Sequence, residues 1–218
     1  MNKLDKAYTM LCNFSEKKEW HNYIKIKYQD YKNQLETIDN ILDSEMAYIQ
    51  DNRTPQEHFI DICRGWLVED LFAYLFMMPN YRGLTLQFDN HDKDRIIRVL
   101  RKEITSTPDF KITYQNKTIS MEVQSLYANI PYFHIKEHKA KKMIVNNSYL
   151  LQLNLMHPEI IIFSPQDIQL GTLREIPEFS TDTIKKYGYQ YYMTDLPKDM
   201  KVYNFTHDLP EKIISLFY

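Results

Sequence analysis

The chain has 218 residues, 26% of them charged, and a formal net charge of −2. This length suits one α/β domain with a substantial core, and 17 Tyr and 11 Phe exclude an intrinsically disordered chain. Only four glycines are present, which excludes the glycine-rich loops that bind dinucleotides or nucleoside triphosphates. The charge balance excludes a uniformly basic protein but allows a local basic face. We therefore expect a folded domain without an organic cofactor.

The cysteines and the apolar segments indicate the compartment. Cys12 and Cys63 are too few for a disulfide framework or a four-ligand zinc site. The first residues lack the apolar run of a secretory signal. Residues 66–78 are apolar but contain Glu69 and Asp70 and are too short to span a bilayer. We expect a cytoplasmic protein that does not enter a membrane.

The first half of the chain has helical patterns. Residues 15–51 carry apolar side chains in steps of three and four, which predicts an amphipathic helix or helix pair. This region should pack over the core or against a second subunit. Thr54, Pro55 and Glu57 form a capping-box pattern, which predicts a buried helix from residue 54 to about 78. Alternation at 84–88 predicts a strand, and residues 92–104 fit another helix.

The second half combines strands and helices. Alternating apolar residues at 110–114 and 119–124 predict a hairpin that turns at Gln115–Asn116. A basic helix is expected from 133 to about 155. Residues 159–164, with an unbroken apolar run at 160–163, are typical of a buried strand of the parallel kind. The remainder predicts a helix at 181–187, strands at 189–193 and 201–205, and a last helix from about Leu209.

The register of the predicted hairpin has a chemical consequence. With a two-residue turn, Ile112 lies opposite Ile119 and Phe110 opposite Met121, so core residues meet core residues. The same rule brings Asp109 opposite Glu122. Facing carboxylates repel each other across a ladder unless a cation lies between them.

A divalent metal ion would remove that repulsion. Mg²⁺ binds one or two carboxylates and keeps water and phosphate oxygens as its other ligands, and we expect Mn²⁺ to substitute. Gln124 projects from the same face as Glu122 and can hold a water or a phosphate oxygen. Such a metal could activate a water for attack on a phosphodiester.

Pro108-Asp109 followed by Glu122-Val123-Gln124 on the next strand resembles the PD-(D/E)xK nuclease signature. The resemblance covers about residues 66–163. It implies a restriction endonuclease-like fold of the α/β (α+β) class, with a central mixed sheet flanked by helices. It also implies that Glu69, on the helix before the hairpin, supports the metal together with Asp109 and Glu122.

The chain departs from this signature at one position, because Gln124 stands where the family usually has a lysine. A lysine from the following basic region could take over, and Lys139 is our choice. Lys136, Lys139 and Lys142 follow one another at intervals of three residues, which would put them on one face of a helix. With His134 and His138, they form a candidate nucleic-acid-binding face.

We therefore predict a Mg²⁺-dependent DNA endonuclease, most similar to Type II restriction enzymes, that acts on double-stranded DNA as a homodimer. Residues 1–218 should form one nuclease domain, with a helical extension at 1–53 and a catalytic core at 54–165. Three alternatives stay open: a repair, phage or RNA-directed nuclease, a catalytically silent nucleic-acid-binding protein, and a purely structural partner domain.

Several other motifs have ordinary explanations. His134 and His138 are spaced for a zinc site on a helix but lack a carboxylate between them in the usual pattern. The aspartates of residues 89–94 resemble a calcium loop without its glycine and final glutamate, which favours a helix-capping loop. The tyrosines of residues 187–192 could stack on bases, although core and rim packing is commoner for such a strand.

Overall fold

The computed structural model describes residues 2–13, 18–37, 54–77, 83–89, 95, 107–126, 132–156, 159–176, 185–192, 202–204 and 209–218. The chain divides into two compact units, one of residues 1–82 with 90–105 and the other of residues 83–89 with 106–218. Most of the helix predicted at 92–104 and the second half of the predicted 15–51 region lie outside the described residues. A single nuclease domain with boundaries at 53/54 and 165 stays a prediction.

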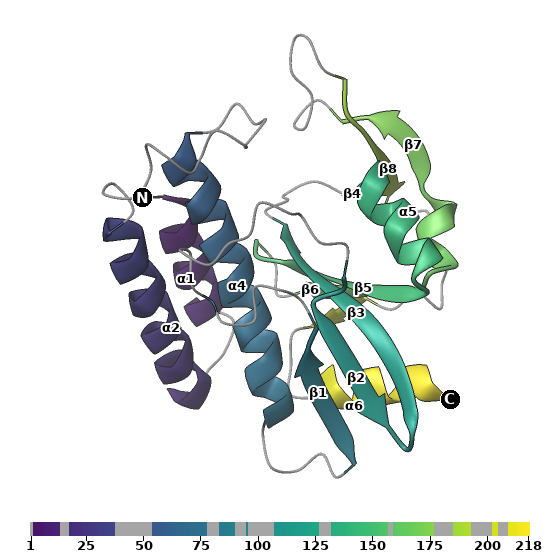
Figure 1. Cartoon of the computed structure of the whole chain (residues 1–218), viewed down its shortest axis with the longest axis horizontal. Helices are drawn as coiled ribbons and strands as arrows, with labels where there is room; N and C mark the ends of the chain where they lie inside the picture. Colours follow the sequence, from purple (N-terminus) through teal and green to yellow (C-terminus); the bar gives the residue numbers. More distant parts are fainter. Residues whose placement is uncertain are drawn as a thin grey trace. The chain divides into compact units, whose positions relative to one another are not determined.

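The described residues of the first unit form the helices α1 (Lys3–Asn13), α2 (Lys18–Glu36) and α4 (Pro55–Met77) (Figure 1). The predicted apolar stripe of α2 is buried, as Ile24 and Tyr31 show with 2% and 1% exposure. The predicted capping box opens α4: the Thr54 N–H donates to Glu57 Oε2 at 2.8 Å, and the Glu57 N–H donates to Thr54 Oγ1 at 3.2 Å. None of the described helices is long and apolar enough to cross a membrane.

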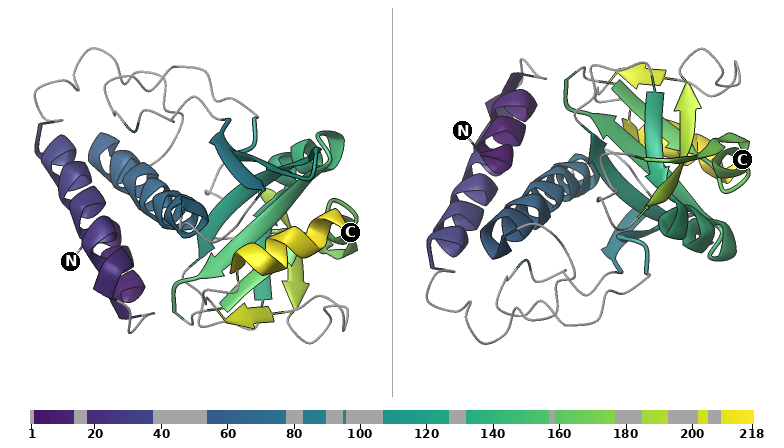
Figure 2. Two further views of the ribbon diagram at one scale, coloured as in Figure 1. Left: turned by 90° about the horizontal axis from the view of Figure 1, so that it is seen from below. Right: turned by 90° about the horizontal axis from the view of Figure 1, so that it is seen from above.

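The second unit is built on a six-stranded mixed sheet, which confirms the predicted fold class (Figures 1 and 2). Its strand order is β1-β2-β3-β5-β6-β9, and among its described pairings only β3 with β5 is parallel. The strands are β1 (Leu84–Phe88), β2 (Phe110–Tyr114), β3 (Lys117–Leu126), β5 (Ser148–Asn154), β6 (Glu159–Phe163) and β9 (Val202–Asn204). The apolar run of β6 is therefore antiparallel to both of its neighbours, which corrects the expected parallel strand.

The hairpin of β2 and β3 has the predicted register. Ile112 pairs with Ile119 and Phe110 with Met121. The turn residues Gln115 and Asn116 have φ angles of 47° and 66°. Two consecutive positive φ angles are typical of a type I′ turn, whose twist matches that of the two strands and so holds the register.

The helix predicted from 133 to 155 is wrong in most of its length. The chain instead forms β4 (Tyr132–Lys136), the short helix α5 (Glu137–Val145) and β5. Asn147, with a φ of 50°, ends the helical segment in a left-handed conformation that asparagine tolerates. His134 and Lys136 therefore lie on a strand, so the single helical face expected for His134, His138 and the three lysines does not exist.

A second sheet completes this unit. β4 pairs with β8 (Tyr187–Tyr192), and β8 pairs with β7 (Thr172–Glu175), which follows the 3₁₀ helix η3 (Asp167–Leu170). Tyr187 lies in β8, which corrects the end of the helix predicted at 181–187, while residues 181–184 lie outside the described part. The chain ends with α6 (Leu209–Ile214) and η6 (Ser215–Phe217), close to the predicted last helix.

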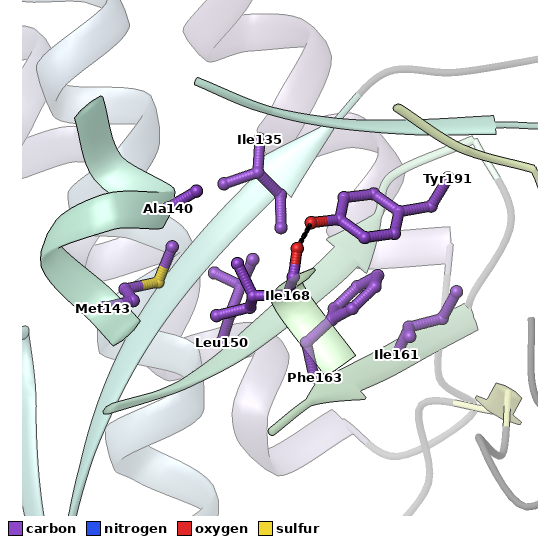
Figure 3. Packing of buried hydrophobic residues seen from close by; sticks show 8 residues of the cluster. All are labelled: Ile135, Ala140, Met143, Leu150, Ile161, Phe163, Ile168 and Tyr191. Atoms are coloured by element: carbon purple, nitrogen blue, oxygen red, sulfur yellow. Dashed lines mark hydrogen bonds between the residues drawn. The ribbon is translucent and has the colours of Figure 1, made fainter. Parts of the chain in front are cut away.

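A cluster of buried side chains joins α5 to both sheets (Figure 3). The Tyr191 hydroxyl donates to the Ile168 carbonyl oxygen within it, as the dashed line shows. The cluster consists of Ile135, Ala140, Met143, Leu150, Ile161, Phe163, Ile168 and Tyr191. Burial of this apolar surface holds α5 against the face of the large sheet that carries Leu150.

Candidate metal and nucleic-acid site

The alternation of β3 separates core residues from candidate site residues. Met121 and Val123 are buried, with 0% and 6% exposure, whereas Glu122 and Gln124 are half-buried. Successive side chains of a strand point to opposite faces, so Glu122 and Gln124 share one face. Leu150 pairs with Glu122 in the parallel β3–β5 register and belongs to the cluster beneath α5. The two polar side chains therefore lie on the face that α5 covers.

Asp109 is held in place through both its backbone and its side chain. Its carbonyl oxygen accepts the Asp89 N–H at 3.0 Å, which continues the pairing of β1 with β2. Its Oδ2 accepts the Val123 N–H at 2.8 Å. The described β2–β3 ladder ends at the pair Phe110–Met121, one step short of the expected Asp109–Glu122 pair. The carboxylate is thus bonded to the backbone of the residue that follows Glu122.

Lys139 of α5 forms an ion pair with Glu122. Its Nζ donates to Glu122 Oε1, and the two side chains are 41% and 14% exposed. Helix packing explains this placement, because Ala140 and Met143 are buried in the cluster and lie one residue after Lys139 and Lys142. α5 thereby brings a cation to the strand whose expected lysine is replaced by Gln124.

Glu69 belongs to the first unit, where it has a cationic partner. Arg95 contacts Glu69 Oε2 through a guanidinium nitrogen at 2.8 Å and donates from Nε to Asp70 Oδ1 at 3.3 Å. The Tyr31 hydroxyl also donates to Asp70, and burial raises the Tyr31 pKa. The Arg95 guanidinium carbon lies 5.7 Å from the centre of the Trp66 ring. Glu69 is therefore part of a buried charge network, and its role as a metal support stays a prediction.

Basic side chains gather around the start of α5. The pKa of His138 is lowered from its ordinary value, first by burial and then by the positive charges of Lys136, Lys139, Lys142 and Lys186. Lys136 ends β4 and immediately precedes α5, while Lys186 immediately precedes β8. These four lysines and His138 therefore form a basic face that is not a single helical face, and its role in nucleic-acid binding stays a prediction.

The side chains of this site suit a hard cation. Asp109 and Glu122 offer carboxylate oxygens and Gln124 an amide oxygen, and Mg²⁺ needs only one or two carboxylates beside water and phosphate. The contact of Lys139 with Glu122 shows that a cationic group reaches this carboxylate. Within the described ranges no three His, Cys, Asp or Glu side chains gather as a metal cluster.

Three residues that contact or adjoin the predicted site residues were not predicted from the sequence. Arg95 had no local signal, although two acids inside an apolar helix require a buried cationic partner. Lys186 follows Lys185 directly before a tyrosine-rich strand. Gln152, only 2% exposed, lies in β5 beside Gln124. A glutamine between Leu151 and Leu153 was the available signal for it.

Comparisons with known proteins add a distant likeness. No family model matches the chain, and no curated protein matches its sequence. Among solved structures, it is similar to Hjc, a Holliday junction resolvase from the archaeal hyperthermophile Archaeoglobus fulgidus, at a TM-score of 0.40 and 9% sequence identity. The likeness covers 70% of this chain and 99% of that chain. A likeness this distant says nothing about the reaction of this chain.

Proposed function

We propose that this chain is a metal-dependent nuclease that hydrolyses DNA, with Asp109 and Glu122 as the metal-binding pair. The observation that carries the proposal is the Lys139–Glu122 ion pair beside the tethered Asp109. Two carboxylates and a lysine are the groups that the PD-(D/E)xK resemblance requires. Here α5 supplies the lysine that the Glu122-Val123-Gln124 strand lacks.

Each side chain has a distinct part in the proposed reaction. A bound Mg²⁺ would polarise the scissile phosphate and lower the pKa of a coordinated water. The bond from the Val123 N–H holds the Asp109 carboxylate in one orientation. The Lys139 ammonium would stabilise the negative charge that develops on the phosphate oxygens. Gln124 accepts a hydrogen bond from the attacking water.

The reaction adds water across one P–O bond. The attacking water gives its proton to bulk water, and the leaving oxygen takes one from bulk water. The basic residues around His138 would hold the strand that carries the scissile phosphate, because lysines neutralise phosphates without reading the base sequence. In this proposal the DNA is cleaved beside the large sheet, and the DNA strand is held by the basic residues at the start of α5.

A catalytically silent nucleic-acid-binding protein is the second candidate. It is favoured by Gln124 at the usual lysine position and by the lack of a three-ligand cluster in the described part of the chain. Both candidates share the basic face, so only cleavage separates them. Type II restriction activity, a homodimer and a preference for duplex DNA stay predictions, as does the alternative of a repair, phage or RNA-directed nuclease.

The test is cleavage of supercoiled plasmid and of labelled single- and double-stranded DNA, with Mg²⁺, with Mn²⁺ and with EDTA. We expect nicking or linearisation with either metal and none with EDTA. Asp109→Asn and Glu122→Gln should abolish cleavage, while Glu211→Gln, an exposed acid on α6, should cleave like the unchanged protein. Binding of DNA without cleavage in any metal would favour the silent candidate.

A further inference from the structure

Gln152 is a buried amide at the border of an apolar cluster. It is 2% exposed and lies in β5, two residues after Leu150 and in register with Ile161 of β6. Both of these neighbours belong to the cluster in Figure 3. Burial of an amide in such surroundings is unfavourable unless its donors and its acceptor find partners.

One end of this amide has a partner. Gln152 Nε2 donates to the carbonyl oxygen of His134 at 3.3 Å. That bond fixes the orientation of the side chain, because an amide oxygen cannot bond to a carbonyl oxygen. Oε1 therefore faces away from β4, and it accepts no hydrogen bond from any residue that the structure describes.

Gln124 is the polar neighbour within reach of that oxygen. It is in register with Gln152 across the parallel β3–β5 pair, so the two side chains share a face about 4.8 Å apart at the backbone. The other in-register neighbour, Ile161, has no side-chain donor. Gln124 is half-buried, and its long side chain can turn its NH₂ group toward Gln152 by rotation about its own bonds.

We propose that Gln152 is a positioning residue for Gln124: its buried Oε1 accepts a hydrogen bond from the Gln124 side-chain NH₂, so that Gln124 presents its amide oxygen to the site. The consequence of this hydrogen bond for DNA cleavage rests on the proposed function. An amide presented this way accepts a bond from water or ligates a hard cation. The opposite orientation would present a donor, which suits a phosphate oxygen but cannot orient an attacking water.

The first experiment needs no activity. In the ¹⁵N-labelled protein, the Gln124 side-chain NH₂ should give resonances with slowed hydrogen exchange. Gln152→Met, which keeps the length of the side chain but removes its acceptor, should shift these resonances and speed their exchange at least several-fold. Gln166→Met changes an exposed glutamine and should leave them unchanged. The proposal would be overturned if the Gln124 resonances were the same in Gln152→Met as in the unchanged protein.

The reverse variant covers the case in which Gln152→Met does not fold. In Gln124→Met, the ¹³C shift of the Gln152 side-chain carbonyl should move, because its oxygen has lost the donor. An unchanged shift would refute the hydrogen bond. Gln124 is half-buried, so this substitution disturbs the fold less than one at Gln152.

Cleavage kinetics then test the functional consequence. Gln152→Met should lower kcat about tenfold with little change in KM, as expected for the loss of one hydrogen bond. The double variant with Gln124→Met should be no slower than Gln124→Met alone, because the two residues act through one amide. Additive losses would overturn the positioning role. If the unchanged protein never cleaves DNA while Gln152→Met still shifts the Gln124 resonances, the proposed function is refuted and the hydrogen bond stands.

Discussion

Replacing Lys139 by Met tests the proposed site most directly. The change removes the cation from Glu122 and leaves an uncharged side chain of similar length. The Lys139 side chain is 41% exposed, so solvent screens the ion pair, and its loss should change the free energy of unfolding by only about 0–1 kcal/mol. The effect on the reaction should be much larger, because the charge acts on the transition state.

The size of that effect follows from similar groups in other enzymes. Loss of one preorganised electrostatic donor lowers kcat about 10²–10³-fold. The exposure of Lys139 favours the lower end, so we expect kcat to fall about 10²-fold in single-turnover cleavage of a labelled duplex in Mg²⁺. Lys139→Arg keeps the positive charge and should recover part of the rate.

Lys142→Met is the matched control. Lys142 lies three residues further along α5, is exposed, and contributes to the same basic face. Its loss should weaken DNA binding and flatten the salt dependence, with kcat unchanged. The role of Lys139 would be refuted if Lys139→Met kept its kcat, or if both variants lost only affinity. Urea unfolding of each variant separates these effects from loss of the fold.

Three further predictions concern ionisable groups in both units. Arg95→Met should lower the free energy of unfolding by about 3–5 kcal/mol, since it leaves Glu69 and Asp70 buried without their cation; urea unfolding measures this, and a change below about 1 kcal/mol would contradict the network. The lowered His138 pKa should rise when DNA binds, because phosphates offset the lysine charges. Binding then takes up protons, so affinity should increase as pH falls toward the lowered pKa of His138, more steeply than in His138→Gln; equal slopes in the two proteins would argue against contact of DNA with His138. Burial raises the pKa of the Cys63 thiol to about 12, so iodoacetamide should modify Cys63 only as the protein unfolds, and modification at the rate of an exposed thiol would contradict its burial.

The elements predicted correctly are those specified by neighbouring residues. The alternation of apolar and polar residues on both sides of Gln115–Asn116 was sufficient to predict the hairpin register. A register shifted by one residue would place core residues on the opposite face of the sheet. The capping box of Thr54 and Glu57 is equally local, because both bonds join residues three apart. Such patterns require no knowledge of the rest of the fold.

The segment 133–155 shows where local patterns are ambiguous. Its apolar residues fit a helix as well as a short strand, and the lysines favour helix. β4 forms because β8 offers it a partner, and β5 because β3 does. Strand pairing with distant residues therefore outweighed helical propensity. The asparagines at 146 and 147 were the one local sign that the helix ends there.

By itself, the sequence determined which residues of the hairpin face the core and that Glu122 and Gln124 share the other face, because strand alternation and a two-residue turn leave one consistent register. Only the tertiary structure decided which partners these residues have. Lys139 meets Glu122 across 17 positions of the chain, and Arg95 meets Asp70 across 25. Gln152 lies beside Gln124 through the parallel pairing of β3 and β5. Contacts of this kind depend on how buried surfaces pack, and packing is a property of the whole unit rather than of any one segment.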